Sequence, residues 1–165
     1  MGLVHLMRHS KFHQEIVRVD ILNRLEKRTH LFDQGDAIAQ VYPLTTFIGL
    51  NQPISMMKVD TEGNELNVIQ GSVHYFSNRL IKNAIVEVTP GGGFWDSLKI
   101  SRSEVADAFA NVASYGYKLV SLWDWKIVSS PEEVRSFVML ANFTQSDVWL
   151  TLEVDILESL SAIKG

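Results

Sequence analysis

The 165-residue sequence contains no cysteine, few prolines, and no apolar run of the roughly 20 residues that a membrane-spanning helix needs. The absence of cysteine excludes disulfides, zinc sites built on thiolates and cysteine nucleophiles. The N-terminus has Arg8 and Lys11 but no apolar stretch of signal-peptide length. We therefore expect a cytoplasmic protein with no membrane partner.

Strong charge of one sign is also absent, because the net charge is only −4. The densest basic stretch, from Arg24 to Arg28, includes Glu26, which indicates a solvated helix face and no nucleic-acid partner. His5, His9 and His13 recur every four residues, but no carboxylate ligand accompanies them. We therefore expect no metal site. The apolar fraction of 46% is that of an ordinary globular domain.

The spacing of apolar residues divides the chain into two parts. Between Gln14 and Leu31 the spacing is roughly helical, so we assign residues 1–40 to an N-terminal helical segment and residues 41–165 to an α/β domain. Short apolar runs from residue 39 onward predict strands over residues 39–42, 54–59, 84–88, 117–123, 137–143 and 148–154. Helices are predicted over residues 64–70, after a capping box formed by Ser101 and Glu104, and after Ser130.

This alternation of strands and helices is typical of an α/β layer with a mainly parallel sheet. The two consecutive strands at the end of the chain suggest an antiparallel edge.

Ionisable side chains gather where the strand over residues 54–59 ends, namely Lys58, Asp60, Glu62 and Glu65, and Glu87 lies near the end of the next strand. In open α/β sheets, ligands bind outside the carboxyl ends of the strands. Converging carboxylates would suit a general base or a metal site. Alternatively, Asp60 and Glu62 accept hydrogen bonds from loop amides, and Lys58 pairs with Glu87. The residues alone favour neither interpretation.

Two aromatic features remain. The segment Thr89–Trp95 contains three glycines and ends in Phe94 and Trp95, so it is either a lid that places Trp95 against a substrate or an ordinary connector. We interpret Trp123, Trp125 and Trp149 as core or partly buried packing residues and not as a base-stacking platform.

Residues 41–88 resemble the second half of the FkbM methyltransferase domain. The similarity is carried by Leu44-Thr45-Thr46, the block from Lys58 to Glu65, Val68-Ile69-Gln70-Gly71 and Ile85-Val86-Glu87-Val88. The resemblance implies a Rossmann-like sheet, S-adenosyl-L-methionine as methyl donor, and O-methylation of hydroxyls on small molecules or sugars. It also implies that Asp60 orients or deprotonates the hydroxyl beside Lys58 and Glu62. We place Glu65, Glu87 and Trp95 on the substrate side.

The chain also departs from this family. Phe47 follows Thr46 where the family has an acid, and the glycines before Asp60 (Gly2, Gly35 and Gly49) form no cofactor loop. The acidic residue that would hold the ribose is missing too. The fold is therefore expected to lack its N-terminal cofactor-loop half.

Three hypotheses follow from these departures. The chain is either a truncated or divergent O-methyltransferase, or a non-catalytic module that binds a partner, including a second copy through an open sheet edge. An unrelated hydrolase or metal enzyme that uses the carboxylates is the third.

Overall fold

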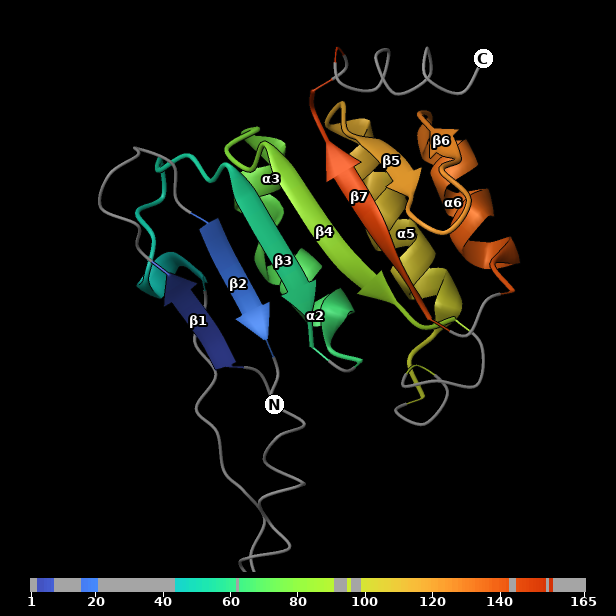
Figure 1. Cartoon of the computed structure of the whole chain (residues 1–165), viewed down its shortest axis with the longest axis horizontal. Helices are drawn as coiled ribbons and strands as arrows, with labels where there is room; N and C mark the ends of the chain where they lie inside the picture. The colour runs from blue at the N-terminus through green and yellow to red at the C-terminus, as the bar shows by residue number, and fades with distance from the viewer. Residues whose placement is uncertain are drawn as a thin grey trace, which may run out of the picture.

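A computed structural model of the chain describes residues 44–61, 63–90, 95, 99–142, 145–153 and 155, together with the backbone of residues 3–7 and 16–20. These residues form one mixed sheet with helices packed on one of its faces (Figure 1). The strands are β1 (Leu3–Met7), β2 (Ile16–Asp20), β3 (Met56–Asp60), β4 (Asn83–Val88), β5 (Lys118–Ser121), β6 (Ile127–Val128) and β7 (Ser146–Thr151). The helices are the 3-10 helix η1 (Leu44–Thr46) and the α-helices α2 (Glu65–Gly71), α3 (Val73–Ser77), α5 (Arg102–Ser114) and α6 (Pro131–Leu140).

The sheet has the strand order β1-β2-β3-β4-β7-β5-β6. Strands β2, β3 and β4 are parallel, whereas β7 lies antiparallel between β4 and β5. The carboxyl ends of β2, β3, β4 and β5 therefore lie toward the same edge of the sheet. Helices α2, α3 and α5 lie behind the sheet in Figure 1, and α6 packs against α5. This is a mixed α/β architecture, in agreement with the Rossmann-like sheet that the resemblance implies.

The alternation of side chains along β3 separates the core from the site. Met57 and Val59 are fully buried, while Met56, Lys58 and Asp60 are half-buried on the opposite face. The buried side chains join those of the helices, such as Phe109, in one hydrophobic cluster. The polar side chains of β3 therefore lie on the face away from the helices.

A buried asparagine fastens the start of β4 to the end of β7. The Asn83 Oδ1 atom accepts hydrogen bonds from Trp149 Nε1 (3.0 Å) and Thr151 Oγ1 (2.8 Å). Its Nδ2 atom donates to the Ser55 carbonyl and to Glu153 Oε2, at 3.2 Å each. All four hydrogen-bonding positions of this amide are thus occupied.

Arg102, at the start of α5, ties the end of α6 to the segment after β4. Its Nη1 atom donates to the carbonyls of Met139 (3.3 Å) and Ala141 (2.9 Å), and its Nη2 atom donates to the Pro90 carbonyl. The last carbonyls of a helix lack partners within the helix and carry partial negative charge. The Arg102 guanidinium donates hydrogen bonds to these carbonyls and places a positive charge beside them.

Two buried tyrosines make similar long-range contacts to the backbone. The Tyr75 hydroxyl donates to the Ile48 carbonyl at 2.8 Å, and the Tyr117 hydroxyl donates to the Ile81 carbonyl. Burial raises the pKa of both phenols, so both stay protonated donors at neutral pH.

The structure confirms most of the predicted elements in the second part of the chain. The strands around Val59, Val86 and Leu119 form, as do the helices that start near Glu65, Ser101 and Ser130. Gly116 follows the end of α5 with φ of 99°, a left-handed conformation that suits glycine.

Four predictions were wrong. Ile16–Asp20 is a strand and does not start a helix, because the β-branched Ile16, Val17 and Val19 favour a strand that pairs with β3. The predicted helical segment over residues 1–40 therefore contains β1 and β2, and its remaining residues lie outside the described ones. The strand predicted over residues 39–42 lies wholly outside the described residues and stays a prediction.

The other errors concern the C-terminal third. Residues 137–140 extend α6, so no strand forms there, and β7 lies inside the sheet because it has strands on both sides. Ser101 forms no side-chain cap; its hydroxyl lies 2.7 Å from that of Ser103. A full capping box forms instead between Ser130 and Glu133.

Replacing Asn83 with alanine tests the amide that links β4 to β7. We expect Asn83→Ala to lower the free energy of unfolding by about 2 kcal/mol, because the Trp149 indole N–H and the Thr151 hydroxyl lose their acceptor in a buried place. Urea denaturation followed by circular dichroism measures this change. The matched control is Asn111→Ala on the exposed side of α5. Equal stability of the two variants would contradict a structural role for Asn83.

Candidate functional site

The charged side chains of β3 and β7 meet on the sheet face that points away from the helices. Lys58 Nζ lies 2.6 Å from Asp147 Oδ1 and 3.9 Å from Asp60 Oδ2. Lys58 reaches Asp147 across β4, which runs between the two strands. The side chains of Asp60 and Asp147 are 33% and 40% exposed, so both carboxylates are accessible from solvent. The cluster is therefore an open polar site at the carboxyl end of β3.

Glu87 lies on β4 next to this cluster. It is the register partner of Asp147, and its Oε1 atom accepts a hydrogen bond from the Gln145 amide. Only 7% of Glu87 is exposed. The ion pairs of Lys58 in the described part are with Asp147 and Asp60, which differs from the predicted pairing of Lys58 with Glu87.

Glu65 organises the loop between β3 and α2. Its Oε1 atom accepts hydrogen bonds from the Thr61 amide (3.0 Å), the Thr61 hydroxyl (3.0 Å) and the Gly63 amide (3.1 Å). Gly63 has φ of 101°, a backbone conformation that residues with a Cβ atom rarely adopt. Glu65 thus accepts hydrogen bonds from loop amides of the kind that we considered for Asp60 and Glu62. Glu65 itself is 1% exposed.

Two buried oxygens near this edge have no hydrogen-bond partner in the described part of the chain. They are Glu65 Oε2, beside the β3–α2 loop, and Thr89 Oγ1, directly after β4. Buried polar atoms are nearly always paired, so each exception calls for an explanation, such as strain, a bound water or ion, or a catalytic role. Both atoms follow the carboxyl ends of parallel strands, where ligands bind in open α/β sheets.

The structure brings some of the predicted site residues together and places others elsewhere. Lys58, Asp60 and Glu87 come together, whereas Glu62 lies outside the described residues. Trp95 is 2% exposed and belongs to the hydrophobic cluster. Whether Glu65, Glu87 and Trp95 contact a substrate stays a prediction.

Sequence reasoning missed Asp147 and Gln145. Neither belongs to a motif, and 89 residues separate Asp147 from Lys58. They reach the site because β7 pairs antiparallel with β4, and the sequence did not indicate that pairing. An acid at the start of a late apolar run was the one available signal.

The described residues contain no group of three histidines or acids that could hold a metal ion. Within the same residues, no helix is long and apolar enough to cross a membrane.

Replacing Glu65 tests the organisation of the loop. We expect Glu65→Ala to lower the free energy of unfolding by at least about 2 kcal/mol, because the amides of Thr61 and Gly63 lose a charged acceptor while staying buried. Thermal and urea unfolding measure this change. The control is Glu104→Ala, at an exposed position of α5. A Glu65→Ala variant as stable as this control would show that the loop does not depend on the carboxylate.

Comparison with known proteins gives one match. The family described as Methyltransferase FkbM domain matches residues 13–119, which is more than half of the chain. The match spans β2, β3, β4 and the helices between β3 and β5, and it includes Lys58 and Asp60. No curated protein and no solved structure is significantly similar to the chain. On this evidence the chain belongs to the FkbM methyltransferase family.

Proposed function

We propose that the chain is a methyltransferase-like protein related to S-adenosylmethionine-dependent O-methyltransferases, and that its acceptor is a hydroxyl group of a small molecule or sugar. The observation that carries this proposal is the accessible cluster of Lys58, Asp60 and Asp147 at the carboxyl end of β3. Lys58 and Asp60 lie inside the region that matches the family.

Asp60 is the residue proposed to meet the hydroxyl. A carboxylate accepts a hydrogen bond from a hydroxyl and can take its proton as a general base. Asp147 makes the shorter contact with Lys58, at 2.6 Å against 3.9 Å for Asp60. Lys58 is thus held mainly by Asp147, which leaves the oxygens of Asp60 open to an incoming hydroxyl. In this proposal Lys58 and Asp147 position Asp60.

Methyltransferases of this family generally use S-adenosylmethionine, but the residues around β2 do not fit that cofactor. Strand β2 lies parallel beside β3, with Asp20 in register with Asp60. The sequence that follows it, from residue 21 to residue 34, contains no glycine. A close approach of the backbone to the methionine part of the cofactor normally requires glycine there.

This mismatch favours a second candidate function, that of a methyltransferase-like module without catalysis of its own. In such a module the acceptor-side cluster would bind a hydroxylated ligand or a partner protein, and transfer would not follow. The two candidates differ in whether the folded chain binds the methyl donor.

Calorimetric titration of S-adenosylmethionine into the folded chain separates the two candidates. The enzyme proposal expects micromolar binding that S-adenosylhomocysteine displaces, followed by transfer of a labelled methyl group to a panel of hydroxylated acceptors. Asp60→Asn should then reduce transfer about 100-fold or more while leaving cofactor affinity unchanged, because it removes a general base. Asp107→Asn, on the exposed side of α5, is the matched control.

Failure of the folded chain to bind the cofactor would exclude methyl transfer by this chain alone and leave the module. Binding with normal transfer by Asp60→Asn would contradict the role proposed for Asp60.

A further inference from the structure

A surface far along the sheet from Asp60 exposes an unusual number of large apolar side chains. Six such side chains are exposed in the described part of the chain, and four of them lie on the β5–β6 hairpin and at the end of α6. They are Trp123 (72% exposed), Trp125 (49%), Ile127 (36%) and Leu140 (80%). The sequence led us to expect Trp123 and Trp125 among the packing residues, and this was wrong. A clustered apolar surface of this kind typically marks an interaction site.

The hairpin that presents the two indoles has a distinctive backbone. Trp125 has φ of 57°, a left-handed conformation that is uncommon for a bulky side chain. The turn is supported by Asp124, whose Oδ1 atom accepts a hydrogen bond from the Lys126 amide at 3.2 Å. Hydrogen bonds from the Ser121 hydroxyl and this amide lower the pKa of Asp124. The exposed indoles therefore sit on a defined turn.

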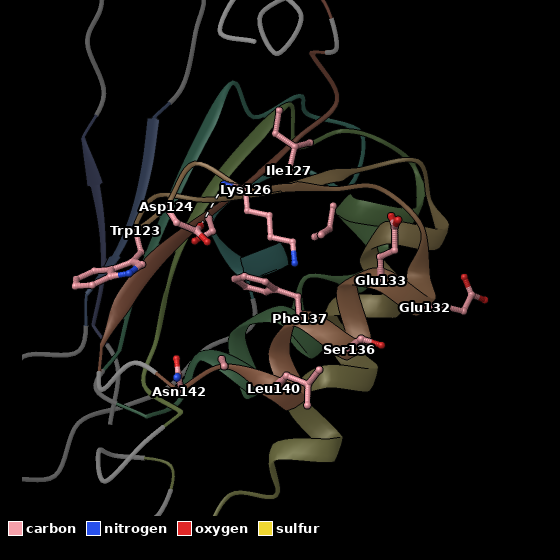
Figure 2. A pocket seen from close by; sticks show the side chains of 13 residues that line it. Trp123, Asp124, Lys126, Ile127, Glu132, Glu133, Ser136, Phe137, Leu140 and Asn142 are labelled. Carbon is pink, nitrogen blue, oxygen red and sulfur yellow. Dashed lines mark hydrogen bonds between the residues drawn. The ribbon is translucent and has the colours of Figure 1, made fainter. Parts of the chain in front are cut away.

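A hollow of about 560 Å³ lies between this hairpin and α6. Its apolar lining includes Val128, Phe137 and Ala141, and Trp123 and Leu140 also border it. In Figure 2, Lys126 extends across the hollow toward Phe137, and the indole of Trp123 points away from its centre. The surface thus combines a projecting tryptophan with an adjoining hollow whose volume suits an aromatic group.

The charges around the hollow have both signs. Lys126 lies in it beside Asp124, whose charge attracts it, and Glu132 borders it on α6. Neither Lys126 nor Glu132 forms a salt bridge with another residue in the described part of the chain. The carboxylate of Glu133, by contrast, is engaged by the amides of Ser129 and Ser130. A partner that carries charges of both signs would match Lys126 as well as the acids around it.

These features fit a second copy of the same chain. We propose that two copies associate about a twofold axis through this surface, with Trp123 of each copy entering the hollow of the other. A twofold axis brings the same surface of both copies together, so the projecting tryptophan of each copy can fill the hollow of the other. The same rotation can set Lys126 against the partner's Glu132, and the reverse.

This surface differs from the open edge that the sequence suggested. The β3 edge is covered by β2, and the proposed contact lies at the other end of the sheet, beside β6. The proposal does not depend on methyltransferase activity.

Sedimentation equilibrium of the full chain over a concentration series tests the proposal. We expect a monomer–dimer equilibrium whose dissociation constant rises at least tenfold in Trp123→Ala and in Leu140→Ser. The matched control is Leu50→Ser, which removes an apolar side chain that is 54% exposed elsewhere. Circular dichroism shows whether each variant is folded.

Charge reversal provides a second measurement. Lys126→Glu and Glu132→Lys should each weaken the homodimer, and an equimolar mixture of the two variants should form a heterodimer. A wild-type chain that stays monomeric at all concentrations would overturn the proposal. So would a dimer that Trp123→Ala leaves unchanged, because it would use another surface.

Discussion

Strand β7 pairs antiparallel with β4 on one side and with β5 on the other, and the candidate site depends on this placement. The pairing brings Asp147 within 2.6 Å of Lys58 and Gln145 next to Glu87. It also supplies Trp149 and Thr151 to the amide of Asn83. One strand that enters the sheet from the end of the chain thus contributes both to the polar site and to the buried network that fixes its own register.

The residues of the family signature divide by burial into two roles. Asp60 is a third exposed and faces solvent beside Lys58, whereas Glu65, five residues later, is buried and holds the loop. Two carboxylates in one short motif therefore have different roles. The exposed one can meet a ligand, and the buried one sets the backbone from which Asp60 and Thr61 project.

Local sequence patterns predicted much of the fold because the strands over β3 and β4 are short, apolar and bounded by turn residues. Helix α6 was predicted from Ser130, Pro131 and the acids that follow, and these do form its first turn and its capping box. The order of the strands was not predictable, since no local pattern indicates that β7 lies between β4 and β5. The ion pair between Lys58 and Asp147 could not be predicted for the same reason. The helical interpretation of Ile16–Asp20 failed because so short an apolar segment suits either periodicity, and pairing with β3 decided the outcome.

Arg102 joins two regions that have so far been considered apart. Its guanidinium binds the Pro90 carbonyl, two residues after β4, and the last carbonyls of α6, next to the hollow below the hairpin. A ligand that displaced the segment after β4 would change the contacts that fix the end of α6. Thermodynamic linkage then requires reciprocity: if binding near β4 alters self-association by some factor, self-association alters that binding by the same factor. Through the single side chain of Arg102, ligand binding near β4 and self-association at the hairpin would thus be coupled.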